Sequence, residues 1–451
     1  MQLDELWVST EVSGVAGGVR NGLSYVMFDN VAFHRTDTKG LRADQGDTGK
    51  VQVLLFDVKD RDLIGYMRPN LNIRQYCCTE DLVDKTRCQP NTLIVQQREK
   101  NSDWPIVMDI YFDGDSTVAY ADDEVIAIEE TGMYHLWFVN CDSRLTDLQI
   151  TGRTIWKNPS GYLPGMMMGF LPFFGGLSLA YLVLGLLWMF AMFRSWRDLI
   201  SLQLYISVVL FFNMLECSVW YFDYVNFNNS GIRPYNITVW AVVIGTLRKT
   251  VSRLLILVVA MGYGLVTPTL GGYGSKVLTL GGSYLVASLT LDVVSNVGNV
   301  DDMTSSAKLI LVLPVAIIDA ILILWVFSSL SKTLNKLASR KQAAKLSMYR
   351  QFTNVLAFGT LVSVGWIGYE MYFKVTDVYN ERWEEDWMTG AFWYVTNLAL
   401  IFAICYLWAP SQNVMRYAYS ELDGDLDAEE LAAAQAQALA EKEDEETGKM
   451  D

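Results

Sequence analysis

One apolar stretch with three basic residues restricts what this chain can fold into. Residues 240–266 read WAVVIGTLRKTVSRLLILVVAMGYGLV, which is long enough to cross a bilayer as one helix rising about 1.5 Å per residue. Arg248, Lys249 and Arg253 lie inside this stretch, and each charge facing lipid would cost roughly 3 kcal/mol or more. Lys249 and Arg253 are four residues apart and therefore share a helix face. We predict that this helix is the inner wall of a bundle of membrane-spanning helices.

The charge of the chain is distributed unevenly. Of a net charge of −15 over 451 residues, the twelve acids and two lysines of residues 421–451 account for −10. This acidic tail argues against a nucleic-acid partner and against attachment to anionic lipid. We interpret it as a solvated segment or, alternatively, as a segment that binds cytosolic sorting adaptors.

The two histidines and six cysteines restrict the chemistry. His34 and His135 both precede the apolar segments, so we expect no histidine-built zinc site, no proton relay and no metal in the bundle. Four cysteines fall in the polar N-terminal part, and two disulfides are expected there in an oxidising compartment. A bridge between adjacent cysteines is strained, so the first two should take different partners among the other two, with both pairings open. These four are Cys77, Cys78, Cys88 and Cys141. The remaining two, Cys217 and Cys405, lie in apolar segments and are interpreted as packing residues.

Residues 1–155 contain short β-rich segments and no run able to span a membrane. Their spacing predicts an antiparallel β-sandwich with strands near 23–34, 50–58, 92–97, 106–112, 124–129, 133–140 and 148–151. The opening MQLDELW is acidic and has no apolar core, so a leader peptide is expected to have been removed or to lie outside this sequence.

Seven apolar segments follow a hinge at residues 156–165. They cover approximately 166–193, 199–222, 239–266, 277–297, 309–330, 352–373 and 389–408. The expected organisation is a membrane protein of mixed class. It has a lumenal sandwich over 1–155, the hinge, a seven-helix bundle over 166–410 and a disordered cytosolic tail over 411–451.

The connections predict the orientation of the bundle. Residues 331–351 form a basic loop without any acid, whereas residues 374–388 are mainly acidic. An excess of cations on the cytosolic side therefore predicts a lumenal N-terminus and a cytosolic C-terminus. The basic loop contains Lys332, Lys336, Arg340, Lys341, Lys345 and Arg350. Asn228 and Asn236 begin glycosylation sequons on the predicted lumenal side.

Acidic residues accompany the three cations in the apolar segments. Asp319 lies at a depth similar to that of Arg248 and Lys249, so we expect a pairing between Arg248 and Asp319. One interpretation is a set of structural ion pairs, and the alternative is a water-filled cavity for an ion or a lipid headgroup. The other acids of this set are Glu216, Asp223, Asp292 and Glu370.

Several seven-helix classes are excluded by missing residues. A retinal protein needs a lysine in its last helix, and residues 389–408 contain none. The sequences GYGLVTPT and CYLWAPSQ stand where rhodopsin-like receptors carry D/E-R-Y and N-P-x-x-Y. No GxGD motif supports an aspartyl protease, and no nucleophile–base set supports another enzyme. We expect no catalytic residue and no cofactor other than a bound phospholipid.

Several long motifs resemble one known family. WKNPSGYLPGMM, YFDYVNFNNSGIRP, LILWVFSSLSKTL and YNERWEEDWMTGAFW, together with the basic helix above, resemble the lung seven-transmembrane receptor family of GOLD-domain seven-helix proteins. Its most similar branch is the transmembrane protein 87 group with its plant and algal relatives. The resemblance covers roughly residues 150–418, and ETGMYHLWFVNCDS resembles late strands of a GOLD β-sandwich.

This resemblance implies residence in the Golgi or neighbouring endomembranes and a role in membrane protein trafficking, including endosome-to-Golgi retrieval. It also implies a lipid-accessible cavity in the bundle. Our first hypothesis adds that the lumenal β-sandwich binds cargo or a partner protein, because a sandwich exposes edges and loops suited to protein contact. The alternatives are a cation channel or transporter with acids at its lumenal mouth, and a signalling receptor unlike rhodopsin.

Overall fold

The chain divides into two compact units. The computed structural model describes residues 7–15, 24–36, 49–68, 73–83, 88–99, 103–114, 116–122, 125–142, 145, 148–233, 235–267, 272–297, 305–340, 342–377 and 379–410. The first unit contains the β-rich N-terminal region together with Tyr224–Arg233 and Gly368–Ala391. The second contains Phe173–Asp223, Pro234–Ile367 and the helical segment that follows Phe392.

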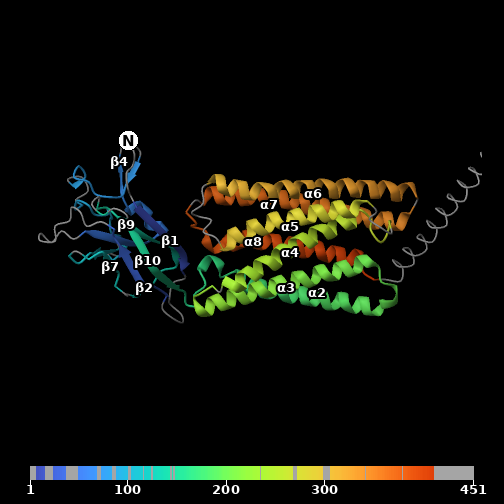
Figure 1. Ribbon diagram of the computed structural model, residues 1–451, viewed down its shortest axis with the longest axis horizontal. Helices are drawn as coiled ribbons and strands as arrows, with labels where there is room; N and C mark the ends of the chain where they lie inside the picture. Colours follow the sequence, from blue (N-terminus) through green and yellow to red (C-terminus); the bar gives the residue numbers. More distant parts are fainter. Residues whose placement is uncertain are drawn as a thin grey trace, which may run out of the picture. The chain divides into compact units, whose positions relative to one another are not determined.

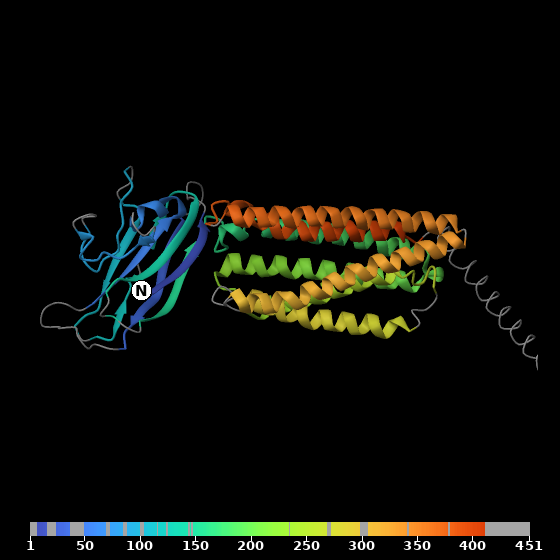
Figure 2. The same ribbon diagram turned by 90° about the horizontal axis from the view of Figure 1, so that it is seen from above.

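The N-terminal region forms two antiparallel sheets, which confirms the predicted architecture (Figures 1 and 2). The strands are β1 (Trp7–Val15), β2 (Ser24–His34), β3 (Lys50–Asp57), β4 (Tyr66–Arg68), β5 (Ile73–Gln75), β6 (Ile106–Tyr111), β7 (Val118–Tyr120), β8 (Val125–Ile128), β9 (Gly132–Asn140) and β10 (Gln149–Lys157). One sheet has the order β1-β9-β3-β6, and the other has the order β10-β2-β7 with β8 also pairing with β2. A separate hairpin joins β4 and β5.

Side chains of both sheets alternate into one core. On β2, Val26, Phe28 and Phe33 are buried, and they belong to one cluster with Val53 and Phe138 of the opposite sheet. This is the period-two burial expected when two sheets face each other across an apolar layer.

The predicted strand at 92–97 is wrong. Leu93 and Val95 make only isolated bridges, to Cys77 and Ile64. This segment instead lies on the outer face of the sheet, where Leu93 and Ile64 pack against Leu54 of β3. Its apolar residues are therefore buried without belonging to a strand. Four strands were not predicted from the sequence, namely β1, β4, β5 and β7. The last three have only three residues each.

Two disulfides hold this outer layer in place. Cys77 bridges Cys141, and Cys78 bridges Cys88, so the adjacent cysteines take different partners as predicted. The first bridge joins the outer layer to the chain directly after β9, across a sequence separation of 64 residues. The other two cysteines are free and buried, in agreement with packing roles.

A buried carboxylate lies where β3 meets the 3-10 helix η2 (Val58–Leu63). Asp57 is 1% exposed, and its Oδ1 accepts a hydrogen bond from the backbone N–H of Lys59 at 3.2 Å. Its Oδ2 lies 3.8 Å from the guanidinium of Arg98, which also binds Asp60 at 2.5 Å and Glu130 at 3.1 Å. Burial is the largest influence and raises the pKa of Asp57, and the nearby carboxylate of Asp60 acts in the same direction.

Substituting Asp57 should therefore change the pH dependence of the sandwich. Because the folded state raises this pKa, the stabilising contribution of the protonated group is present at low pH and is lost as pH rises through the folded pKa. We expect the melting temperature of Asp57→Asn, relative to wild type, to be higher at pH 7.5 than at pH 4.5. Thermal unfolding of both proteins across this range measures the difference, and a constant offset would contradict the assignment. The exposed Asp62 is the matched control position because its pKa is shifted downward, chiefly by Arg74.

Seven α-helices follow within the described part of the chain, as predicted (Figure 1). They are α2 (Phe170–Arg194), α3 (Ser201–Ser230), α4 (Tyr235–Ala260), α5 (Tyr273–Val297), α6 (Ser305–Ser339), α7 (Ala343–Thr376) and α8 (Trp383–Leu407). All except α4 are long and apolar enough to span a membrane by length and composition. The three cations of α4 explain why it differs from the other six.

The expected basic loop at 331–351 is mostly helical. Helix α6 continues to Ser339 and α7 begins at Ala343, so the connection is short. Lys345 is buried, and its Nζ donates to the carbonyl of Leu265 at 2.9 Å. Leu265 lies in the turn after α4, because this helix ends at Ala260, six residues before the predicted end. Lys345 is thus a structural residue, and Lys341 and the tail at 411–451 lie outside the described residues.

Candidate functional site

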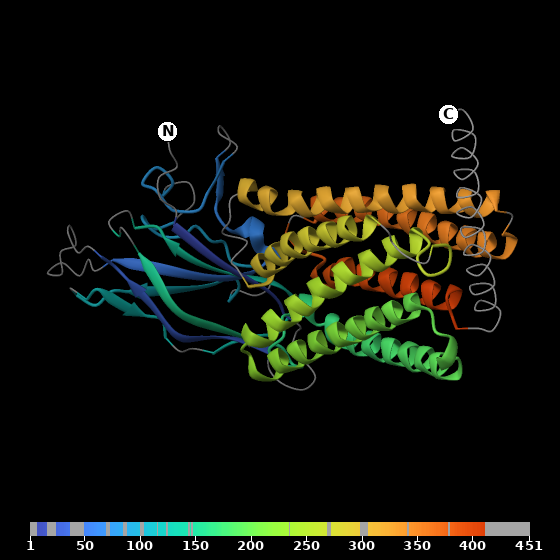
Figure 3. The ribbon, with the colours of Figure 1, turned by 45° about the vertical axis from the view of Figure 1, so that its right-hand side comes forward.

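Helix α4 lies among α3, α5 and α6 and carries the polar centre of the bundle. It runs obliquely to its neighbours (Figure 3). Small or short side chains such as Ala241, Gly245 and Ser252 are found on its buried positions. Each of its three cations contacts an acid on a different helix. This confirms the prediction that the segment is an inner wall.

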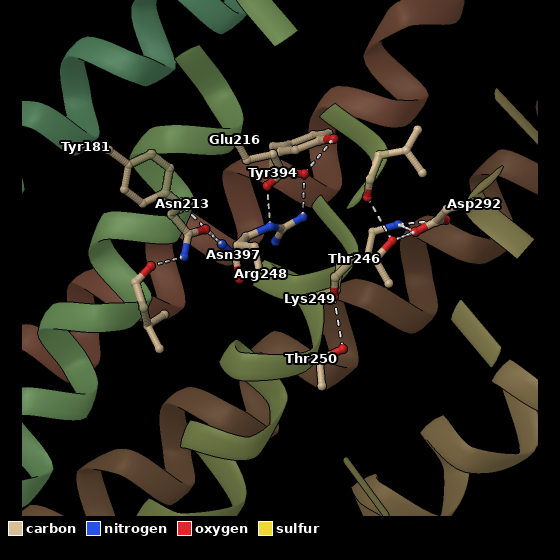
Figure 4. Close-up of polar contacts among 12 residues, drawn as sticks. Tyr181, Asn213, Glu216, Thr246, Arg248, Lys249, Thr250, Asp292, Tyr394 and Asn397 are labelled. Atoms are coloured by element: carbon tan, nitrogen blue, oxygen red, sulfur yellow. Dashed lines mark hydrogen bonds and ion pairs between the residues drawn. The ribbon is translucent and has the colours of Figure 1, made fainter. Parts of the chain in front are cut away.

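The first pair is almost completely buried. Arg248 binds Glu216 of α3 through Nη2 at 3.3 Å, and its Nε forms a second close contact with the same carboxylate. The two side chains are only 9% and 1% exposed. The hydroxyl of Tyr394 on α8 lies 3.4 Å from Glu216 Oε1, and the centroid of its ring lies 5.5 Å from the guanidinium carbon of Arg248 (Figure 4). A Cβ at Gly245 would lie 2.8 Å from Glu216 Oε1, so this glycine makes room for the carboxylate.

The second pair is more accessible. The ammonium group of Lys249 lies 2.9 and 3.0 Å from the two carboxylate oxygens of Asp292 on α5. The hydroxyl of Thr246, one turn earlier on α4, also donates to Asp292 at 2.8 Å (Figure 4). The side chains of the pair are 33% and 18% exposed.

The third pair is bidentate and slightly more accessible than the second. Arg253 donates from Nε and Nη2 to the two oxygens of Asp319 on α6, at 2.6 and 3.1 Å. Its guanidinium lies 4.7 Å from the ring centroid of Tyr284 on α5. The side chains are 36% and 28% exposed. A planar fork on a carboxylate fixes orientation as well as charge, which a lysine at this position would not do.

The predicted pairing of Arg248 with Asp319 is wrong. Counting residues from the helix ends places Arg248 and Asp319 at the same depth in the bundle. Because α4 runs obliquely, however, each of its residues adds less depth than this count assumes (Figure 3). Arg253, which lies further along α4, therefore reaches Asp319 instead. Rotation around the helix then directs Arg248 to α3.

A polar chain beside the buried pair was not predicted. The amide of Asn397 on α8 donates to Asn213 Oδ1 of α3 at 2.7 Å and to the hydroxyl of Tyr181 on α2 at 3.0 Å (Figure 4). Asn213 in turn donates to the carbonyl of Val209 at 2.8 Å. Asparagine in an apolar segment is the sequence signal that would have indicated it, since a buried amide needs partners.

Two further predicted acids, Asp223 and Glu370, have partners other than the three cations of α4. Asp223 is buried and accepts a hydrogen bond from Thr238 at 3.0 Å. Glu370 forms an i,i+4 pair with Lys374 at 2.8 Å. Among the residues that the structure describes, no group of three or more His, Cys, Asp or Glu converges to hold a metal ion.

The two sequon asparagines differ in their surroundings. Asn228 donates from Nδ2 to the carbonyl of Ser160 at 2.9 Å and accepts from the N–H of Leu163 at 3.2 Å. Asn236, by contrast, is exposed. Glycosylation at either position stays a prediction, and Asn228 already has a structural role.

Comparison with known proteins identifies relatives of the whole bundle. The model of the GOST seven transmembrane domain matches residues 169–415. Human transmembrane protein 87B is 30% identical over 311 residues, which are 68% of this chain and 55% of that protein. Transmembrane protein 87A of Xenopus tropicalis is 32% identical over 275 residues, covering 60% of this chain and 50% of that protein.

A yeast relative extends further along the chain. Membrane protein PTM1 of Saccharomyces cerevisiae is 26% identical over 427 residues, covering 87% of this chain and 76% of that protein. The chain spans about half the length of the transmembrane protein 87 relatives that it matches. With seven helices in the matched region and these relatives, the chain belongs to the GOST seven-transmembrane family of multi-pass membrane proteins.

Proposed function

We propose that the protein binds a phospholipid headgroup at the two accessible ion pairs of α4 and acts in membrane protein trafficking. The observation that carries this proposal is the exposure of Lys249–Asp292 and Arg253–Asp319, between 18% and 36%, on helices of a membrane bundle. Partly exposed charges at such positions need a polar neighbour, because contact with hydrocarbon is costly.

The composition of the site favours a zwitterionic headgroup. Two cations and two carboxylates give no net charge, so neither an anion nor a cation alone matches the site. A phosphate can accept from Arg253 or Lys249, while a primary ammonium can donate to Asp292 or Asp319. Phosphatidylethanolamine offers both groups, whereas the quaternary ammonium of phosphatidylcholine has no N–H to donate.

Neutralising one pair should reduce lipid retention. In Arg253→Gln/Asp319→Asn the charges disappear together, so no lone charge is left in the bundle. We expect the double variant to retain several-fold less phosphatidylethanolamine than wild type, as measured by native mass spectrometry of the protein purified from mixed vesicles. The matched control is Lys374→Gln/Glu370→Gln, which removes an ion pair outside the site. Equal retention by the two double variants would overturn the proposal.

The second part of the proposal is that the protein resides in Golgi or neighbouring endomembranes and acts there in membrane protein trafficking. The two-sheet N-terminal domain supports this part, because open sheet edges and loops are suited to binding a cargo or partner protein. Retention of a tagged protein in Golgi membranes, and altered recycling of membrane proteins after its removal, are the corresponding tests. A protein resident at the plasma membrane would count against this location.

A cation channel is the second candidate. It is favoured by the same accessible acids, Asp292 and Asp319, which are carried on two adjacent helices. Ion flux through the purified protein in liposomes distinguishes the two functions. A cation conductance that is altered in Asp319→Asn and Glu216→Gln would favour the channel, and no flux across voltage, pH and tension would exclude it.

A further inference from the structure

Four cations form a basic end of the bundle where α6 and α7 meet. Lys332 and Lys336 are four residues apart and therefore lie along one side of α6, and Arg340 follows directly after its end. Arg350 lies on α7, two turns after the short connection. Lys332, Arg340 and Arg350 are exposed, and Lys336 is half-buried. We call these four residues the basic end.

The chain supplies little negative charge near the basic end. No acid occurs between Asp319 and Glu370, and none occurs between Asp386 and Glu421. Among the residues described by the structure, no acidic side chain forms an ion pair with Lys332, Lys336 or Arg350. Lys332, Lys336 and Arg350 are thus not neutralised by acidic side chains of the described helices.

The last described residues of the chain lie next to this surface. The ring of Trp408, directly after α8, packs against Tyr349 and Phe352 of α7 at centroid distances of 5.8 and 5.1 Å. Tyr349 precedes Arg350, so the chain leaves the bundle beside the basic end. Residues 421–430 contain six acids and no base, and residues 441–446 contain five acids and one lysine.

The connection after residue 410 is long enough for the acids of the tail to reach the basic end. The first acid, Glu421, comes eleven positions after residue 410, which gives a maximum span of roughly 36 Å. For a flexible chain of that length the root-mean-square distance is about 18 Å. A tether this short gives an effective concentration in the millimolar range, so individually weak ion pairs are formed repeatedly.

We propose that the acidic segment 421–446 binds the basic end of the same molecule and covers it against anionic lipid headgroups. The charges are complementary in sign, and the connection between them is short. Anionic lipid is the natural competitor, because an exposed basic cluster attracts it by about 1 kcal/mol per cation. The state of the tail then decides whether the basic end contacts the membrane surface.

Protease protection tests this contact in the full-length protein. The protein is placed in phosphatidylcholine nanodiscs at low salt, and release of tail peptides by a glutamate-specific protease is followed by mass spectrometry. We expect Lys332→Gln/Arg340→Gln/Arg350→Gln to accelerate cleavage within 421–446 about fivefold, because bound carboxylates are shielded from the protease. The control Lys59→Gln/Arg153→Gln/Lys374→Gln also removes three exposed cations, all from the other unit, and should be cleaved as wild type.

Two further measurements decide whether the acidic segment or anionic lipid occupies the basic end. Carbodiimide should cross-link carboxylates of 421–446 to Lys332 or Lys336 in wild type, and about 0.5 M salt should abolish these links by screening. Phosphatidylserine in the nanodiscs should raise wild-type cleavage toward that of the basic-end variant. Equal cleavage of the two triple variants, or no cross-link at low salt, would overturn the proposal and leave the basic end to lipid alone.

Discussion

Arg248→Leu should destabilise the bundle by about 3–5 kcal/mol, the loss expected when one member of a buried ion pair is removed. Glu216 is 1% exposed, and without Arg248 it keeps the hydroxyl of Tyr394 as a polar neighbour at 3.4 Å. The carboxylate would then lie in the bundle without a compensating charge. We expect a large loss of correctly folded protein and retention of the remainder early in the secretory route. Thermal unfolding in detergent, followed by size-exclusion chromatography, measures the loss.

A double variant separates the lone charge from the loss of packing. Arg248→Leu/Glu216→Gln removes both charges and should recover part of the stability lost by the single substitution. Glu370→Gln, which breaks the more exposed pair with Lys374, should change stability by less than about 1 kcal/mol. If Arg248→Leu is exported and melts like wild type, the Glu216–Arg248 pair is not a structural element.

Removal of the Cys77–Cys141 bridge should also cause a large loss of stability, in this case of the β-sandwich. Its sequence separation of 64 residues corresponds to a chain-entropy contribution of about 4 kcal/mol, against about 3 kcal/mol for the separation of 10 in Cys78–Cys88. The longer bridge also holds the outer layer on β3 and β9, where Leu54, Phe56 and Val139 are buried. Cys77→Ala/Cys141→Ala should therefore lower the unfolding temperature of the sandwich more than Cys78→Ala/Cys88→Ala.

Hydrogen exchange would locate the change. With the longer bridge removed, amides of β3 and of the segment around Leu93 should lose protection first, while β2 and β10 in the opposite sheet stay protected. Equal melting temperatures for the two double variants, or loss of protection spread evenly over both sheets, would contradict the role given to this bridge.

The sequence by itself determined the class of the protein. Three cations in one apolar segment required an inner helix, because lipid would not tolerate them, and six other apolar runs supplied the bundle. Alternating segments predicted the strands that became β2, β3, β6, β8, β9 and the beginning of β10. Adjacent cysteines required different partners. These are local constraints, and they hold in any arrangement of the helices.

Only the tertiary structure decided which charges meet. The tilt of α4 sets the depth of Arg253 and brings it to Asp319, while rotation around the axis takes Arg248 to Glu216. It also decided that Lys345 is buried beneath the turn after α4, and that Leu93 covers a sheet instead of forming a strand. Depth counted along one helix assumes a common tilt, whereas pairing depends on the positions of two helices. For this reason composition and spacing indicated the polar centre, whereas helix packing determined which acid pairs with each cation.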